Sequence, residues 1–384
     1  MLKCKQAKFS LPPNVSYLNG SYLSPMLKSV EKVGIKGLRM KKNPVLITPE
    51  AFFTDSEILR QEFATLINAH DPKSIAIIPS VSYGIAVVAK NIKLKSDEHI
   101  LVASEQFPSN YYAWAKLAEE NGAEVKAIAP PDTLVNRGKL WNERILESIN
   151  AKTKVVALGN VHWADGTRFD LKAIRKRTKE IGAFLIIDGT QSVGALPFDV
   201  QEVQPDALIC AGYKWLLGPY GIGLAYFGEA FANGKPLEEN WINRLNSEDF
   251  SSLVIYQEHY QPGSLRFDVG EHSNFILVPM MIKALNQLNK WKVENVQEYC
   301  YHLTKEPIER LREKGFWIED EQYRGSHLFG IRLPQHVQLE QLKAALLKNK
   351  IYVSYRGSAI RVSPNVYNDE ADLNKLVKVL KKLG

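Results

Sequence analysis

Short apolar runs alternate with longer stretches of helical periodicity from about residue 57 to residue 261, and this alternation constrains the fold more than any other feature. The apolar runs fall at residues 75–78, 100–102, 125–129, 155–158, 184–187 and 207–210. Their length and continuity predict strands that are buried on both faces. Strands that alternate with helices are typical of an α/β fold with a mainly parallel sheet. Residues 222–227 follow the turn-forming sequence Gly-Pro-Tyr-Gly, so this strand can return antiparallel.

The chain has 384 residues, which is long for a single compact core, so we expect two domains. Residues 31–261 carry the alternating pattern and are expected to form a large α/β domain with helices on both faces of the sheet. Residues 262–384 contain longer helical stretches and are expected to form a smaller α+β domain. Residues 1–30 are expected to pack near the functional site. The last helix is expected to begin after Asn368 as its N-cap and to carry an apolar stripe.

Composition and charge argue against several classes of protein. Apolar residues make up 45% and charged residues 24% of the chain, as in an ordinary globular protein. The net charge of +7 is spread over separate stretches that are typical of solvated helix faces, so we expect no nucleic-acid partner. No apolar run is long enough to cross a bilayer, so we expect a cytoplasmic protein without membrane contact. The three cysteines, Cys4, Cys210 and Cys300, lack the spacing of a disulfide framework or a metal site.

Two predicted strands end in charged side chains that point to chemistry. Asp188 ends one strand, and Lys214 follows the next strand after a tight turn. In a parallel sheet, both positions lie at the edge where the carboxyl ends of the strands open a ligand crevice. Tyr213 and Trp215 flank the lysine and partly desolvate it, which favours the neutral amine that attacks an aldehyde. A carboxylate in the same crevice can pair with a ring N–H⁺ and keep that ring protonated as an electron sink.

Either residue alone is more often a helix cap or a solvated lysine, but the two together with their flanking glycines form a specific pattern. The stretch from residue 186 to residue 226 resembles the class V aminotransferase family, which has the aspartate-aminotransferase-like fold (fold type I). The resemblance extends from residues 17–20 to the final helix. It implies that the chain binds pyridoxal 5'-phosphate, acts on a small amino-acid substrate and forms a homodimer with shared active sites. Residues 266–274 match the stretch that crosses the dimer interface.

The resemblance also implies roles for three residues of this pattern. Lys214 would carry the cofactor as a Schiff base and move the α-proton of the substrate. Asp188 would pair with the pyridine nitrogen of the cofactor. Gln191 would donate a hydrogen bond to its phenolic oxygen.

The segment from residue 80 to residue 84 matches the phosphate loop of the family, with Val81 and Ser82 as contacts. This segment follows a predicted strand and opens a helix, so its backbone N–H groups can also bind a phosphate on physical grounds alone. A simple serine N-cap is the alternative interpretation. Tyr213 matches a family position that reaches the same phosphate.

Further positions are assigned by the resemblance alone. Phe107 would stack on the cofactor ring, and Trp163 and His162 would lie at the rim of the cofactor pocket, with His162 facing the substrate. Arg361 matches the residue that binds the substrate carboxylate, for which a guanidinium is the natural bidentate partner. Asn19 would shape the substrate pocket. Outside this context, a lone histidine or a phenylalanine before a proline is usually structural, and a strand arginine usually forms a salt bridge.

The reaction type is the least determined property. Cysteine desulfurases need a nucleophilic cysteine on a loop before the Arg361 segment, and no cysteine follows Cys300, so we do not expect desulfurase activity. Transamination is the favoured reaction. Epimerisation and kynureninase-like C–C cleavage stay open, since Phe107 and Tyr213 resemble the kynureninase branch whereas Gln191 departs from it. A non-catalytic protein that binds an amino acid or the cofactor is the alternative from another class.

Overall fold

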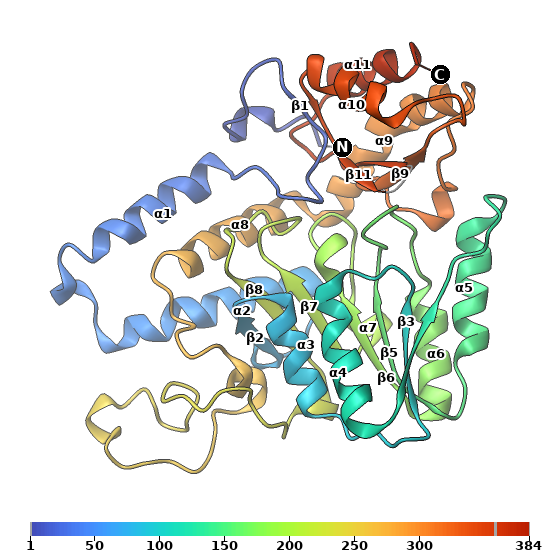
Figure 1. The fold of residues 1–384 in the computed structure, drawn as a ribbon. Coiled ribbons are helices and arrows are strands. Elements are labelled where there is room, and N and C mark those ends of the chain that lie inside the picture. Colours follow the sequence, from blue (N-terminus) through green and yellow to red (C-terminus); the bar gives the residue numbers. More distant parts are fainter. Residues whose placement is uncertain (1, 357–358, 384) are drawn as a thin grey trace.

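The computed structural model describes residues 2–356 and 359–383, and a seven-stranded sheet forms its centre (Figure 1). The strands lie in the order β2 (Ile75–Ile78), β8 (Gly223–Phe227), β7 (Ala207–Ala211), β6 (Phe184–Asp188), β5 (Thr153–Gly159), β3 (His99–Ala103) and β4 (Glu124–Ile128). Strand β8 runs antiparallel to both of its neighbours, and the other adjacent pairs are parallel. The predicted mainly parallel sheet and its returning strand are therefore confirmed.

Helices cover both faces of this sheet. One face carries α3 (Val81–Lys90) and α4 (Tyr112–Asn121), and the other carries α2 (Thr54–Ile67), α5 (Arg137–Ser148), α6 (Leu171–Ile181) and α8 (Leu277–Trp291). Alternate residues of each strand belong to the two apolar cores: Ile100 and Val102 of β3 join the core under α3 and α4, whereas Leu101 joins the other. Successive side chains of a strand point to opposite faces, so a strand covered on both sides is apolar throughout.

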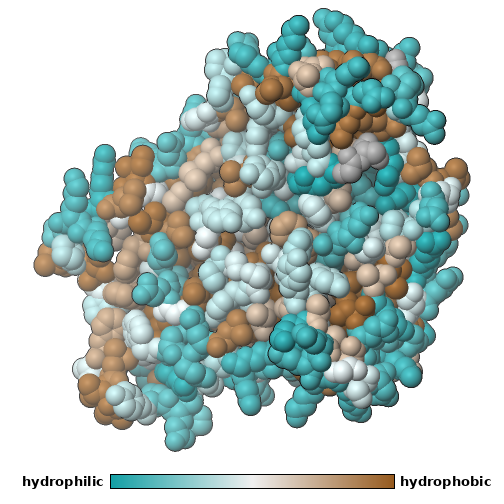
Figure 2. Space-filling view, in the orientation of Figure 1, coloured by the Kyte–Doolittle hydropathy of each residue, from teal (hydrophilic) through white to brown (hydrophobic). Residues whose placement is uncertain are grey.

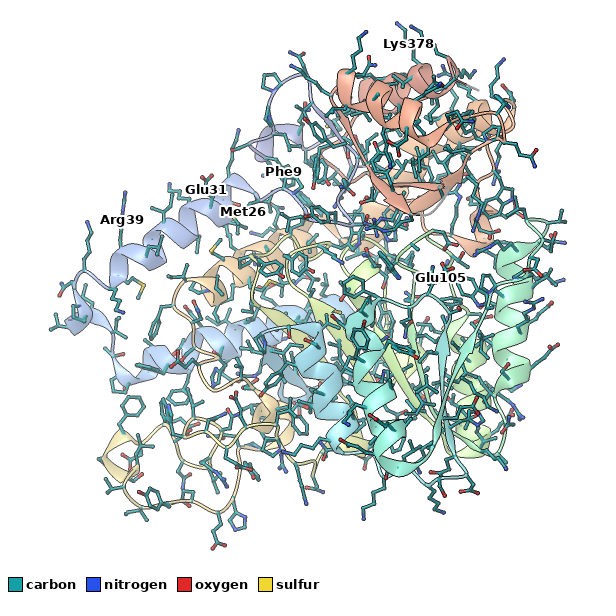
Figure 3. The ribbon with its side chains drawn as sticks, in the orientation of Figure 1. Phe9, Met26, Glu31, Arg39, Glu105 and Lys378 are labelled. Atoms are coloured by element: carbon teal, nitrogen blue, oxygen red, sulfur yellow. The ribbon has the colours of Figure 1, made fainter. Side chains whose placement is uncertain are left out.

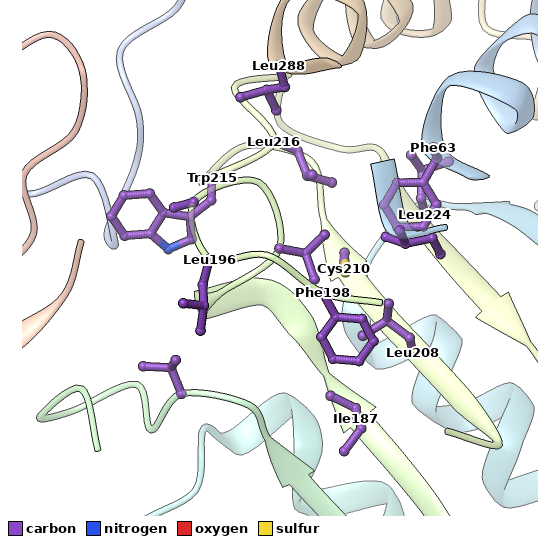
Figure 4. Close-up of a cluster of buried hydrophobic side chains, with 14 of the residues drawn as sticks. Phe63, Ile187, Leu196, Phe198, Leu208, Cys210, Trp215, Leu216, Leu224 and Leu288 are labelled. Atoms are coloured by element: carbon purple, nitrogen blue, oxygen red, sulfur yellow. The ribbon is translucent and has the colours of Figure 1, made fainter. Parts of the chain in front are cut away.

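A dense apolar cluster supports the strand ends that carry the predicted site (Figure 4). Ile187 of β6 packs with Leu208 and Cys210 of β7, and Trp215 extends the same cluster from the turn that follows β7. Each of these four side chains is at most 1% exposed. Because interiors are close-packed, this cluster fixes the turn between β7 and β8 relative to the sheet.

The C-terminal part forms a second, smaller layer with a core of its own. It contains α9 (Val293–Arg312), β9 (Phe329–Arg332), α10 (Leu339–Lys348), β10 (Ile351–Tyr352), β11 (Ser354–Arg356), β12 (Ala359–Val362) and α11 (Glu370–Leu380). Strands β11, β12 and β9 form an antiparallel sheet. The N-terminal strand β1 (Ser16–Tyr17) pairs with β10, which brings the N-terminal segment alongside this layer.

Helix α8 links the two layers. It packs against α2 and against α1 (Lys28–Met40), and its buried residues belong to the core of the large sheet. Apart from Leu18 of the N-terminal segment, the first residue of the C-terminal core along the chain is Leu303, within α9. The boundary near residue 262 stays a prediction, but the packing joins residues 277–291 to the large layer.

The N-cap of helix α11 lies one residue later than the sequence predicted. Its N-cap is Asp369, whose carboxylate accepts the backbone N–H of Asp372, and the Asp372 carboxylate in turn accepts the N–H of Asp369. This reciprocal pair is a capping box. Asn368, which was expected to cap the helix, instead donates its side-chain amide to the carbonyl of Tyr17 and to Asp372. Asn and Asp both suit an N-cap, so the choice depended on tertiary contacts.

Hydrophilic side chains cover much of the face seen in Figure 2, and apolar ones gather toward its left edge. Figure 1 places the end of α1 and the segment before α8 at this edge. The residues in and just after α1 and those before α8 include the exposed apolar side chains Leu38, Val45, Leu46, Val254 and Tyr256. Within the described part of the chain, no helix combines the length and the apolarity that a membrane crossing requires.

Gly166 provides a test of the packing between the layers. It has a φ of +81°, and a Cβ atom there would lie 2.4 Å from the backbone oxygen of Leu328, in the C-terminal layer. We expect Gly166→Ala to lower the free energy of unfolding by the backbone strain plus about 1–3 kcal/mol for the overpacked contact. Gly182→Ala is the matched control, because Gly182 has a φ of +72° but open space around it. Equal losses for the two variants in urea unfolding would contradict this packing.

Candidate active site

A cavity of about 260 Å³ opens at the carboxyl ends of the central strands and at the start of α3. Such a crevice is the usual ligand site of an open α/β sheet. The cavity lining includes these predicted site residues: Val81, Ser82, Phe107, His162, Trp163, Asp188, Gln191, Tyr213 and Lys214. Asn19 and Arg361, the other two predicted residues, are not part of this lining. The fold therefore gathers most of the predicted site from distant parts of the sequence.

Asp188 is the last residue of β6 and is held by the turn that follows it. Its Oδ1 accepts the backbone N–H of Thr190 at 2.9 Å, and the Thr190 hydroxyl accepts the N–H of Ala211 at 3.1 Å. These bonds fasten the end of β6 to the end of β7. Burial raises the pKa of Asp188, against the opposite effects of the Thr190 hydrogen bonds and of the Lys214 charge. A cationic N–H beside this carboxyl group would favour its ionised form.

Lys214 is buried in the same cavity, 6% exposed. Its Nζ lies 5.3 Å from the ring centroid of Phe107 and 5.6 Å from that of Tyr213. Burial lowers the pKa of Lys214 from 10.5 to about 8; nearby arginine charges lower it too, and Asp188 raises it. At pH 7 roughly a tenth of the Lys214 amine is therefore neutral and nucleophilic, far more than for an exposed lysine.

Gln191 is fixed by contacts on three sides. Its Nε2 donates to the carbonyl of Ser21 at 3.1 Å, its Oε1 accepts from the indole N–H of Trp215 at 3.2 Å, and its backbone carbonyl accepts from Nε2 of His327 at 2.8 Å. Burial lowers the pKa of His327 to about 4, so this imidazole is neutral at physiological pH. An amide nitrogen carries two N–H groups, so Gln191 has a second donor to offer a ligand in the cavity.

The start of α3 has the properties of an anion site. Ser80 is the N-cap of α3, which was the alternative interpretation of this segment in the sequence. The Ser80 hydroxyl accepts the N–H of Tyr83 at 3.2 Å. The hydroxyl of Ser82 lies 2.9 Å from that of Ser80. The first N–H groups of a helix have no intrahelical acceptor, so those of Val81 and Ser82 can bind an anion. A serine cap and a phosphate site are therefore compatible in this loop.

Phe107, Trp163 and His162 form one wall of the cavity. The ring of Phe107 packs edge-to-face on Trp163 with centroids 5.4 Å apart, and the Trp163 indole donates to the carbonyl of Glu105, which is labelled in Figure 3. His162 is 3% exposed, and its two ring nitrogens lie 3.2 Å from the carbonyl of Ser104 and 3.2 Å from the Asp165 carboxylate. Both ring nitrogens of His162 have partners within the protein. His162 therefore forms part of the cavity wall and has no free N–H group to offer a substrate.

Arg361 and Asn19 are linked through Ser354 and lie behind the cavity wall rather than in its lining. Arg361 donates to the carbonyl of Trp163 and, at 3.2 Å, to the hydroxyl of Ser354, which donates to Oδ1 of Asn19 at 2.7 Å. Burial and the charge of Arg356 lower the pKa of Arg361 to about 9. The contact with Trp163 places the guanidinium beside the cavity, and Asn19 acts on it through Ser354.

Sequence reasoning missed three residues around the site. Tyr220 lines the cavity, with its ring 4.6 Å from that of Tyr213, and the turn sequence gave no signal for it. Ser354 connects Asn19 to Arg361. Arg356 lies over Trp163. The period-two spacing of positions 354 and 356 in a strand-like run was an available signal that both side chains share a face.

The family of this chain follows from comparison with known proteins. Residues 49–376 match the model of the aminotransferase class-V family, so the chain belongs to this family. An uncharacterized aminotransferase, YcbU of Bacillus subtilis (strain 168), is 27% identical over 84% of this chain and 82% of its own. A probable cysteine desulfurase of Streptomyces coelicolor is 26% identical over 66% of this chain and 60% of its own.

Solved structures agree with the fold. A lysine mutant of C-DES with glycine covalently linked to its PLP cofactor has a TM-score of 0.87 and 18% identity, and covers 99% of this chain and 100% of its own. The Escherichia coli cysteine desulfurase CsdA has a TM-score of 0.82 and 20% identity, over 98% and 97% of the two chains. These likenesses confirm fold type I. Pyridoxal phosphate is the expected cofactor of this family.

The cavity fits this cofactor by its own chemistry. It combines a buried amine at Lys214, a carboxyl group at Asp188 and a helix N-terminus at Val81 and Ser82. An aldehyde, a ring nitrogen and a phosphate are the respective partners of these groups. The aromatic wall that contains Phe107 suits the face of a ring.

The pKa of Lys214 leads to a prediction about cofactor uptake. We expect the rate at which cofactor-free protein takes up pyridoxal phosphate to rise with pH with a midpoint near 8, because only the neutral amine attacks the aldehyde. Asp188→Asn should move this midpoint down, since the Asp188 charge raises the pKa. Arg361→Gln should move it up, since the Arg361 charge lowers it. Absorbance measured after stopped-flow mixing gives the rate, and a midpoint close to 10.5 would show that the amine is not desolvated.

Proposed function

We propose that this chain is an aminotransferase that holds pyridoxal phosphate on Lys214 and acts at the α-carbon of an amino acid. The observation that carries the proposal is the Lys214 amine, which is buried in the cavity that Asp188 and Phe107 also line and has a pKa lowered to about 8. When bound, the cofactor supplies an electron sink for negative charge that develops at the α-carbon. The protein supplies the position, the proton transfers and the electrostatic environment.

Each cavity residue has a role in this proposal. Asp188 holds a proton on the pyridine nitrogen, and the N–H groups of Val81 and Ser82 bind the phosphate with help from Tyr213. The second N–H of Gln191 donates to the phenolic oxygen. Lys214, as a neutral amine, takes the proton from the α-carbon and returns it, a role for which its lowered pKa is suited.

The aromatic wall of the cavity and Arg361 have the remaining roles in this proposal. Phe107 covers one face of the cofactor ring, and Trp163 supports Phe107. Arg361 binds the α-carboxylate of the substrate, and Ser354 and Asn19 hold the guanidinium in place. His162 shapes the substrate side of the wall.

The positions of the cysteines support transamination over desulfurisation. Cys210 and Cys300 are buried, and burial raises the pKa of both thiols. Cys4 is exposed, and no cysteine is part of the cavity lining that the described residues form. A desulfurase needs a thiolate that reaches the substrate, and a buried thiol of raised pKa is a poor nucleophile.

A half-reaction assay tests the proposal. We expect the protein loaded with pyridoxal phosphate to convert the cofactor to the pyridoxamine form when an L-amino acid is added, and a 2-oxo acid to reverse the change. The visible absorbance spectrum reports both steps, and Arg361→Met should weaken the response by about tenfold or more. Racemised amino acid without pyridoxamine formation would favour the epimerase, and a cleaved side chain the C–C lyase. Protein that binds the cofactor but turns over no amino acid would favour the non-catalytic binder.

We also propose that the chain forms a homodimer through the exposed apolar residues near α1 and before α8. Val254 is 83% exposed and Tyr256 is 93% exposed, and Leu38 of α1 and Val45 just after it are exposed too. Figure 1 shows the end of α1 and the segment before α8 on the same side of the molecule. Exposed apolar patches of this kind mark interaction surfaces. The segment 266–274 lies between Tyr256 and α8 along the chain, and the family resemblance places this segment at the interface.

We expect size-exclusion chromatography with light scattering to give the mass of a dimer, and Tyr256→Glu together with Val254→Glu to shift it toward the monomer. Burying two uncompensated charges in an apolar interface is costly. Leu347→Glu, in the exposed part of α10, is the control and should leave the mass unchanged. A wild-type monomer that still turns over an amino acid would contradict the shared-site dimer.

A further inference from the structure

Strands β11 and β12 present two arginines on one face of a hairpin. Their register pairs Ser354 with Arg361 and Arg356 with Ala359. Cross-strand partners share a face, and side chains two positions apart in a strand share it too, so Arg356 points to the same side as Ser354 and Arg361. Diagonal neighbours of this kind lie about 7–8 Å apart, with their Cβ atoms somewhat closer, which lets two long side chains reach one ligand.

Both guanidinium groups lie against the wall of the active-site cavity. The Cζ atom of Arg356 is 4.7 Å from the ring centroid of Trp163, and that of Arg361 is 5.9 Å from it. Trp163 lines the cavity that contains Lys214 and packs on Phe107. The two arginines therefore border the substrate side of the cavity.

Neither guanidinium is neutralised by the residues that the structure describes. The hydrogen bonds of Arg356 and Arg361 go to the carbonyls of Tyr355 and Trp163 and to the hydroxyl of Ser354, and none goes to a carboxylate. The Nε atoms of both arginines are buried and have no hydrogen-bond partner among residues 2–356 and 359–383. Buried charge without a counter-charge is costly, so this pair is arranged to receive an anion.

We propose that the substrate is an amino acid with an acidic side chain, whose α-carboxylate binds Arg361 and whose side-chain carboxylate binds Arg356. This inference rests on the proposed function, which assigns Arg361 to the α-carboxylate. One guanidinium suffices for the α-carboxylate that every amino acid carries, and the second requires another anionic group. A neutral side chain would leave Arg356 partly desolvated on Trp163 with no counter-charge.

Unreactive analogues test this inference without relying on turnover. Succinate carries two carboxylates and butyrate carries one on the same number of carbons, and neither has an amino group that could react. We expect calorimetry on the protein loaded with pyridoxal phosphate to give at least tenfold tighter binding of succinate than of butyrate. Arg356→Gln should abolish this difference, and Arg356→Lys, which keeps the charge but loses the bidentate geometry, should retain part of it.

Arg144→Gln is the matched control, because Arg144 lies exposed on α5 and is not part of the cavity lining. This variant should keep the full preference for succinate. Equal affinities for the two acids in the wild type, or an unchanged preference in folded Arg356→Gln, would overturn the inference. The same titration on cofactor-free protein separates the two proposals. Suppose that the protein prefers succinate through Arg356 but never links the cofactor to Lys214. This result would overturn the proposed function and leave the inference about Arg356 standing.

Discussion

The parallel pairing of β6 with β7 is the interaction on which the site depends. Its register aligns Asp188 with Ile209, so the carboxylate and the turn that carries Lys214 emerge at the same edge of the sheet. Both strands are buried on both faces, and a shift of one residue would exchange the side chains of the two cores. Apolar packing thus sets the position of the polar groups, and the Thr190 hydrogen bonds complete the alignment.

Burial then gives these groups their chemistry. The same dry environment lowers the pKa of Lys214 and raises that of Asp188, so each is shifted toward its neutral form. Arg356 and Arg361 add positive charge that the described residues leave without a carboxylate partner. An aldehyde-bearing cofactor with a phosphate and an acidic substrate would bring chemical partners for the amine, the carboxyl group and the two guanidinium groups.

The sequence predicted the features that depend on local pattern. Continuous apolar runs marked the central strands, and the charged residues at their ends marked Asp188 and Lys214 as neighbours. Features that depend on the pairing of distant segments were not accessible. The link from Asn19 through Ser354 to Arg361 requires the N-terminal segment to lie on the C-terminal layer, and the role of Arg356 requires the register of a hairpin. Asp369 replaced Asn368 as a cap because the tertiary contact with Tyr17 engaged the asparagine.

The attachment point of the cofactor is the most direct test of this account. Protein loaded with pyridoxal phosphate is reduced with borohydride and digested, and the peptides are analysed by mass spectrometry. The account predicts that a single peptide gains the mass of the reduced cofactor and that fragmentation places this mass on Lys214. A label on any other lysine, or no label after reduction, would contradict the central claim that the buried Lys214 amine is the nucleophile of this site.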